Sequence, residues 1–414
     1  MLFCGLLGWA SAAQAQGKLT GVALDSATNE PLSFASVFLA NTTLGVTTTE
    51  KGEFTFPKVP TGTYDVVASY VGYRLAKQSV TIGREPQQVT LKLASTGNQL
   101  GEVVVKPAPN KPEEYETFSR LFIGASTFSD QCRISNPDNV RVLYDDSTKE
   151  LTARAKEFVQ VDNEALGYRL KYYGLEFGYN KADGTISYYG EPVFEEMKPR
   201  DEKQRQLWAA NRLTAYTGSF MHFLRSVYTN RLTAENFLVQ QVRVGPNPRY
   251  EAAQTKQRLL KERRANGGAT RAERDSVLKW SREAPITAAL STAPMPIDSI
   301  RRMSLDGKHT YLSFTGDLQV AYFGEAPDPR YKKAMSPLGA SKKPYPAKRQ
   351  VSRVRLSDGE AEIQANGSPM NPLDVLLGEY WGFEKIGEFM PFDYVPTDAP
   401  PAPVNLKEST GAGR

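Results

Sequence analysis

Histidine is scarce in this chain of 414 residues, which contains only His222 and His309. A zinc hydrolase site needs two imidazoles and a carboxylate on one metal, typically with a glutamate three residues after the first histidine. Arg225 and Leu312 occupy those positions, and the two histidines fall in different predicted elements. The sequence therefore predicts no metal site and no cofactor, and it favours a protein that is not an enzyme.

Cysteine is equally scarce, because Cys4 and Cys132 are the only two. Cys4 lies in an apolar N-terminal segment, and if that segment is removed no intrachain disulfide can form. The fold must then rest on its apolar core, even in an oxidising compartment. We expect Cys132 to be a small buried residue. A reactive thiol is the alternative.

Other catalytic signatures are missing as well. The sequence has no Walker loop, no dinucleotide-binding fingerprint and no Gly-x-Ser-x-Gly elbow. The residue counts alone do not exclude a Ser-His-Asp site, in which His222 or His309 would be the base. Ser219 precedes a predicted helix, however, where a capping role explains it. With 51 basic and 46 acidic residues the net charge is only +5, so we expect no nucleic-acid partner.

No apolar run is long enough to cross a bilayer, so the mature chain is expected to have no transmembrane span. Residues 1–15 are apolar and end in Ala13-Gln14-Ala15. This pattern predicts a secretory signal cleaved after Ala15, although the basic start of such a signal is missing. We expect an exported protein, located in the periplasm or associated with the outer membrane.

Residues 17–95 show the pattern of an antiparallel β-sandwich. Short alternating segments are separated by turns that contain glycine or proline, at intervals of about ten residues. Phe54 and Phe56 share one face of a strand, and Gly52 and Gly62 stand where turns need a positive φ. Pro57 lies in a segment that cannot be a central strand.

Several segments of this region resemble the carboxypeptidase-like regulatory domain. The resemblance implies a transthyretin-like sandwich of about seven strands, in a family common among envelope proteins of Bacteroidota. Glu50 departs from the family, which usually has aspartate before that turn. The matching segments are Gly21–Asp25, Glu30–Leu32, Ala35–Val37, Thr49–Phe54, Gly62–Tyr64 and Ser69–Tyr73.

Residues 96–114 are predicted to be a linker, stiffened by three prolines. Within it, Glu102–Val105 resembles the TonB-box region of envelope receptors that carry the same N-terminal domain. The resemblance implies one possible role, as an accessory subunit of a TonB-linked uptake system.

Residues 115–395 are expected to form a second domain of mixed α and β structure, so the whole chain is mainly β with α. Alternation and turn residues predict three hairpins, at 140–155, 167–189 and 311–323. Residues 254–283 are rich in charge and predict two short helices in an insertion. Their charged face is expected to be solvated, and contact with an anionic lipid or glycan is the alternative. The proline- and alanine-rich residues 396–414 are expected to be a disordered tail.

The candidate ligand-binding residues lie in the first half of this second domain. Tyr168 and Tyr172 lie on one face of a predicted strand. They would form a stacking platform for sugar rings, or else be half-buried sheet residues. Trp208 and Arg212 lie one turn apart on a predicted helix. His222 lies off the apolar stripe of the next helix, Phe220 to Tyr228, whose N-cap is Ser219.

The sequence favours a non-catalytic binding or structural protein of the cell envelope, with an envelope protein or a glycan as partner. One alternative is a glycan-directed hydrolase or carbohydrate-binding protein, which the tyrosines and the abundant carboxylates suggest. The other is the accessory subunit implied by Glu102–Val105. The sequence identifies neither the ligand nor the oligomeric state.

Overall fold

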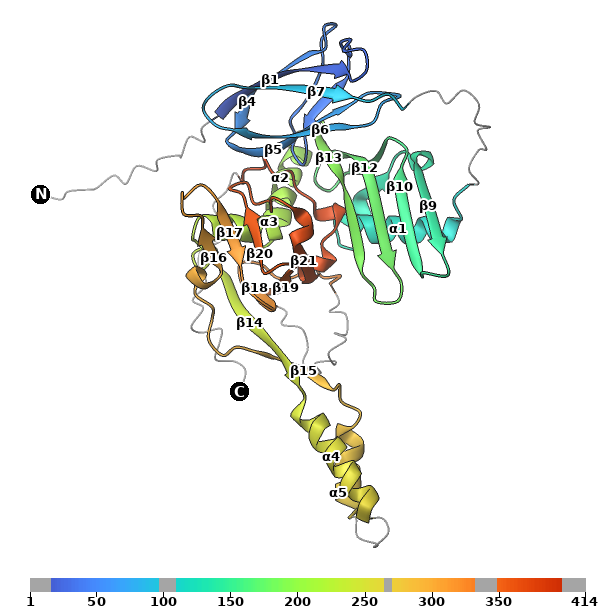
Figure 1. The fold of residues 1–414 in the computed structure, drawn as a ribbon, viewed down its shortest axis with the longest axis vertical. Coiled ribbons are helices and arrows are strands. Elements are labelled where there is room, and N and C mark those ends of the chain that lie inside the picture. The colour runs from blue at the N-terminus through green and yellow to red at the C-terminus, as the bar shows by residue number, and fades with distance from the viewer. Residues whose placement is uncertain (1–15, 97–108, 264–269, 332–347, 397–414) are drawn as a thin grey trace, which may run out of the picture. The chain divides into compact units, whose positions relative to one another are not determined.

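The computed structural model describes residues 16–96, 109–263, 270–331 and 348–396. The predicted signal segment, most of the predicted linker and nearly all of the predicted tail lie outside these ranges. The described chain forms two compact units (Figure 1). The first contains residues 16–123, 131–211 and 390–395, and the second contains residues 124–130 and 212–389.

The first unit begins with a seven-stranded sandwich, as the alternating pattern predicts. One sheet has the strand order β4-β1-β7 and the other β3-β2-β5-β6. One pair departs from the antiparallel pattern, because β1 runs parallel to β7. The strands are β1 (Gln16–Asp25), β2 (Ser36–Leu39), β3 (Gly45–Thr47), β4 (Glu53–Pro60), β5 (Gly62–Ser69), β6 (Ala76–Ile82) and β7 (Gln87–Leu93).

Pro57 lies inside β4 rather than in a link between strands. The strand tolerates it because β4 is the edge strand of its sheet, where a missing N–H leaves no neighbour unpaired. Phe54 and Phe56 of the same strand point inward and are buried with Leu19 and Leu91 in the core between the two sheets.

A six-stranded sheet completes the first unit. Its strands are β8 (Cys132–Ile134), β9 (Val140–Asp145), β10 (Glu150–Ala155), β11 (Phe158–Asn163), β12 (Tyr168–Asn180) and β13 (Ile186–Glu196). Helix α1 (Pro112–Ile123) packs on it through Phe118 and Phe122, both fully buried against Phe177. The helix starts at Pro112, within the predicted linker, since proline suits the first helical position.

The sandwich packs directly on this sheet. The Phe38 ring of β2 stacks on Tyr173 of β12 with ring centroids 4.9 Å apart, and Val67 and Val193 complete a buried cluster. The chain also returns here at its other end, where the Phe392 amide donates to the Asn41 carbonyl at 2.7 Å. The predicted boundary near residue 95 therefore ends the sandwich but not the compact unit.

The second unit has two sheets around α3 (Phe220–Tyr228). The five-stranded sheet has the order β15-β14-β18-β19-β21 and the three-stranded sheet β16-β17-β20. Phe223, Leu224 and Val227 of α3 are fully buried between them. The strands are β14 (Phe237–Pro246), β15 (Ile286–Leu290), β16 (Arg301–Met303), β17 (Thr310–Ser313), β18 (Asp317–Tyr322), β19 (Gln350–Leu356), β20 (Glu360–Ile363) and β21 (Val375–Glu379).

The hairpin predicted at residues 311–323 is wrong. Strand β17 pairs with β16 and β20, whereas β18 pairs with β14 and β19. The turn at Gly316, with φ of +77°, therefore carries the chain from one sheet to the other. A turn signal marks a change of direction but not the partner of the strand that follows.

The helices agree more closely with the predictions. Helix α3 has the predicted N-cap, since Ser219 Oγ accepts from the His222 amide. Helix α2 (Glu202–Tyr216) begins before the predicted Trp208. The charged insertion forms α4 (Pro248–Arg263) and α5 (Arg271–Trp280), and α6 (Tyr380–Phe383) follows β21. No helix in the described ranges is long and apolar enough to span a membrane.

Candidate functional site

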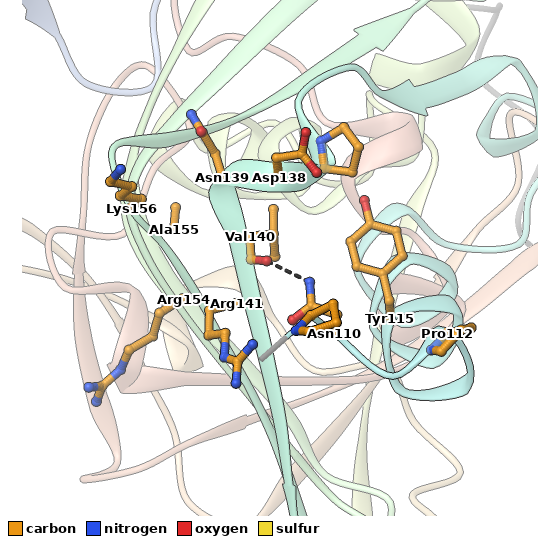
Figure 2. A pocket seen from close by; sticks show the side chains of 12 residues that line it. Asn110, Pro112, Tyr115, Asp138, Asn139, Val140, Arg141, Arg154, Ala155 and Lys156 are labelled. Atoms are coloured by element: carbon orange, nitrogen blue, oxygen red, sulfur yellow. Dashed lines mark hydrogen bonds between the residues drawn. The ribbon is translucent and has the colours of Figure 1, made fainter. Parts of the chain in front are cut away.

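An open groove of about 790 Å³ lies in the first unit, between the start of α1 and the strands β9 and β10 (Figure 2). Asn110 fixes its geometry, because its side-chain amide donates to the Val140 carbonyl at 2.7 Å and accepts from the Val142 amide at 2.9 Å. Asn110 thus satisfies two backbone groups, the Val140 carbonyl and the Val142 amide, at the outer edge of the edge strand β9.

The rim of the groove is basic. Arg141, Arg154 and Lys156 line it, together with one carboxylate, Asp138. Arg141 and Arg154 are direct partners in the β9–β10 ladder, so their side chains leave the sheet side by side on one face (Figure 2). Glu176 of β12 lies across from Arg154, with 3.7 Å between the charged atoms.

The rest of the lining is apolar or amide-bearing and includes Tyr115 of α1, which faces Asp138 in Figure 2. Burial and the nearby Asp138 charge raise the pKa of the Tyr115 phenol, which therefore stays protonated and can donate a hydrogen bond. No histidine, cysteine or serine belongs to the lining. The groove offers a flat ring, amides and cations, which suits binding of an anionic ligand.

The candidate tyrosines are packing residues of the six-stranded sheet. Tyr168 is only 3% exposed and meets Phe194 edge to face, and Tyr172 is 4% exposed against Phe122. Neither ring presents a face to solvent, so these two tyrosines form no open stacking platform. Of the tyrosines in this stretch, Tyr189 is the one with substantial exposure, at 42%.

Trp208 is also buried, and its indole Nε1 donates to the Glu164 carbonyl at 2.8 Å. The ring covers Gly167, where an added Cβ would lie 2.3 Å from indole carbons and where φ is +68°. Only glycine suits both conditions. Trp208 thus anchors the turn before β12, while Arg212, one turn further along, is half-buried and belongs to the other compact unit.

His222 lies off the apolar stripe of α3, yet its side chain is only 4% exposed. Its Nδ1 accepts from the Gly218 amide at 3.0 Å, and its Nε2 lies 3.5 Å from Glu235 Oε2. Burial lowers the pKa of the imidazole, so the neutral ring with a proton on Nε2 fits both contacts. Both ring nitrogens are thereby occupied, and neither faces Ser219, whose hydroxyl donates to the Tyr216 carbonyl.

His309 immediately precedes β17 of the three-stranded sheet, and its Nδ1 lies 2.6 Å from Glu362 Oε1 on β20. The hydrogen bond and charge of Glu362 raise the pKa of the imidazole. Cys132 is half-buried on β8, which is more exposed than predicted. Within the ranges that the structure covers, no three His, Cys, Asp or Glu side chains are placed to hold a metal ion.

Sequence reasoning did not single out a group of carboxyls in the second unit. Burial raises the pKa of Glu325 to about 7, that of Glu388 to about 8 and that of Glu384 well above its usual range. One oxygen each of Glu325 and Glu388 is buried without a hydrogen-bond partner. Tyr380, whose phenol pKa is raised by burial and by the Glu384 charge, packs with Tyr331 and Phe383.

The comparisons with solved structures give weak matches. A group B streptococcus pilus 2b backbone protein is 22% identical, with 21% of this chain and 43% of that chain covered at a TM-score of 0.18. The Bacillus anthracis TIE protein is 17% identical, with 44% and 32% covered at 0.17. The chain therefore spans less than half of either protein.

A putative carbohydrate binding protein from Bacteroides uniformis is 11% identical, with 43% of this chain and 78% of that chain covered at a TM-score of 0.17. No curated protein matches the chain. The match that agrees with the geometry is to a family model, the CarboxypepD_reg-like domain, over residues 19–105. That span holds the seven strands of the sandwich apart from the first residues of β1. The chain therefore carries a carboxypeptidase-like regulatory domain of the CarboxypepD_reg-like family.

Proposed function

We propose that the protein is a non-catalytic binding protein of the cell envelope and that its groove beside β9 and β10 binds an anionic glycan. The pair of Arg141 and Arg154 is the observation that supports this most. Like charges directly opposite each other on paired strands destabilise a sheet. Glu176 offsets part of this repulsion at Arg154, and an anionic ligand beside both guanidinium groups would offset more of it.

The composition of the groove favours binding over bond cleavage. Glycoside hydrolysis uses two carboxylates on opposite sides of the scissile bond, and the lining holds Asp138 alone. Tyr115 and the prolines of the lining offer flat apolar surfaces on which a sugar ring can rest, while the cations select for a carboxylate or sulfate substituent.

Titration with polygalacturonate, an acidic polysaccharide, tests this directly, with dextran as the neutral comparison. We expect binding of the acidic polymer only. Arg154→Gln and Lys156→Gln should together weaken it at least about tenfold, since hydrogen bonds to charged groups contribute roughly 1.5–3 kcal/mol each. Arg133→Gln is the matched control, because Arg133 is an exposed arginine on β8 of the same sheet. Equal affinity for dextran, or equal loss in the control, contradicts the proposal.

Export belongs to the proposal and is supported by the apolar residues 1–15 with their Ala-Gln-Ala ending. Cell fractionation tests it, and native protein recovered from the cytoplasm with residues 1–15 intact would contradict it. The role as a TonB-linked accessory subunit rests on Glu102–Val105, which lie outside the described residues. Pull-down from outer-membrane extracts with no receptor above background would count against that role.

The glutamates of the second unit favour a hydrolase as a second candidate function. Burial raises the pKa of Glu325 to about 7 and that of Glu388 to about 8, which suits a general acid, and Tyr380 lies close enough to Glu325 for their charges to interact. A reducing-end assay on acidic and neutral glycans distinguishes the two functions. Product that disappears in Glu388→Gln and persists in Arg154→Gln would support hydrolysis, whereas binding without product supports the groove.

A further inference from the structure

The projecting part of the second unit, residues 242–263 and 270–290, has a chemistry that the groove does not explain. It comprises the outer half of β14, helices α4 and α5, and β15, and we call it the arm. Figure 1 shows α4 and α5 at its far end, away from the sheets of the same unit. We propose that the arm docks on a membrane surface that contains anionic phospholipid.

Charge is concentrated on the arm. Its sequence contains ten Lys and Arg against five Asp and Glu, a formal charge of +5, which equals that of the whole chain. The rest of the protein is therefore close to neutral. A local excess of this size attracts an anionic surface at close range, since each basic residue near such a surface adds to the attraction.

Basic side chains from both the ribbon and the helices lie on the outside of the arm. Arg243, Arg258, Lys279 and Arg282 are all exposed. Acidic neighbours offset part of the charge, because Arg249 lies 3.6 Å from Glu283 and Arg271 lies 4.0 Å from Asp275. The acidic residues are too few to neutralise the arm, so the positive excess faces solvent.

The β14–β15 ribbon adds an apolar face. Residues directly opposite on antiparallel strands point to the same side, and the register pairs Val244 with Ala288 and Val242 with Leu290. Ile286 falls on that side too, since it is two residues from Ala288. Val244, Ile286 and Leu290 are 48%, 45% and 44% exposed, whereas the opposite face carries Arg243 and Thr287.

The helices continue this combination of basic and apolar groups. Leu259 of α4 and Leu278 of α5 are 44% and 56% exposed, which leaves two large apolar side chains among the cations. Trp280 lies under Lys256, with the ammonium 5.0 Å from the ring centroid. Basic residues interspersed with leucine and tryptophan are the composition of segments that lie in the headgroup region of a bilayer.

A lipid surface accounts for both features at once. The cations pair with phosphate groups, and the exposed apolar side chains enter the boundary between headgroups and acyl chains. A second copy of the chain would bring one +5 arm against another if the arms paired through the edge strand β15, and the two charges would repel each other. The charge therefore favours an anionic membrane over self-association.

Sedimentation of the full chain with vesicles tests the proposal. We expect the chain to sediment with vesicles of phosphatidylglycerol and phosphatidylcholine in 150 mM salt, to bind pure phosphatidylcholine at least about tenfold more weakly, and to be released by 0.5 M salt. The triple variant R258Q/K279Q/R282Q should lose at least about tenfold in affinity. The variant L278S/I286S, at exposed sites, should also weaken binding.

The control variant K18Q/K51Q/K58Q removes the same charge from exposed positions of the sandwich. It should bind vesicles as the parent does, and circular dichroism confirms that every variant is folded. Binding that does not depend on the presence of phosphatidylglycerol, or that weakens equally in the control variant, overturns the proposal. A dimer in sedimentation velocity that disappears in L278S/I286S, without vesicle binding by the parent, would assign the arm to self-association instead.

Discussion

The core around α3 and the surface turn before β17 each contain a histidine beside a glutamate, and the pKa values of the two histidines are shifted in opposite directions. His222 is buried among Phe237, Tyr216 and Tyr322, and its pKa is lowered despite the nearby Glu235. His309 is about half exposed, and Glu362 raises its pKa. In the core the cost of removing charge from water exceeds the attraction of the carboxylate, whereas at the surface the attraction prevails.

The comparison shows what each pair contributes. His222 holds the Gly218 amide and joins α3 to the segment that carries Glu235, so it is part of the packing. His309 closes a turn on the surface, where the Ser304 hydroxyl accepts from the His309 amide at 3.0 Å. The same two residue types therefore have a structural role in one region and a local electrostatic role in the other.

The largest expected effect comes from the core itself. Phe223→Ala removes a fully buried ring that packs on Phe237 and Trp381, and it should lower the free energy of unfolding by about 3–5 kcal/mol. Chemical denaturation of the full chain measures this. Leu305→Ala, at a fully exposed side chain near His309, is the control and should change little. If the Phe223→Ala protein is as stable as the parent, α3 does not contribute to the core in the way described.

His222→Ala should come next, at about 2–4 kcal/mol. The substitution leaves the buried Gly218 amide without its acceptor and Glu235 without its partner, and it also opens a small cavity. His309→Ala is the matched variant and should have a much smaller effect, because its side chain is well hydrated. Equal losses in the two variants would mean that burial does not distinguish the pairs.

The pH dependence sharpens the comparison further. With only two histidines in the chain, an NMR titration of the ring protons gives one midpoint above and one below the ordinary value of 6.5. Because the folded protein holds His222 neutral, stability should fall as pH drops below 6.5, where the unfolded chain takes up the proton first. The stabilisation from His309 is present below pH 6.5 and disappears as pH rises through its higher folded pKa.

Glu362→Gln should have the smallest effect on stability and a clear effect on titration. The amide retains a hydrogen bond to His309 but removes the charge, so the midpoint of His309 should return toward 6.5 while that of His222 stays unchanged. If the His309 midpoint does not move, another group sets its pKa.

The sequence was most informative where a structural feature depends on residues that are close together in the chain. Alternation gave the faces of Phe54 and Phe56, and the capping chemistry of Ser219 gave the start of α3. It did not show that His222 is buried, because two of the three rings around it come from β14 and β18. The spacing of residues along α3 does not carry that information.

The candidate site shows the same division. The basic rim depends on the register that places Arg141 opposite Arg154, and two charged residues in separate strands give no such signal. The platform predicted from Tyr168 and Tyr172 had the right spacing for a strand face. That face is the one covered by other aromatic rings of the first unit, which spacing alone does not reveal.

The parallel pairing of β1 with β7 has a consequence for how the sandwich folds. Leu19 pairs with Gln87, so β1 cannot pair with β7 until nearly the whole domain has been synthesised. The hairpin of β5 and β6 can form early from local contacts, whereas β1 must wait for a closure that spans most of the domain. Because β1 lies between β4 and β7, that late step joins the two ends of the domain and makes its unfolding cooperative.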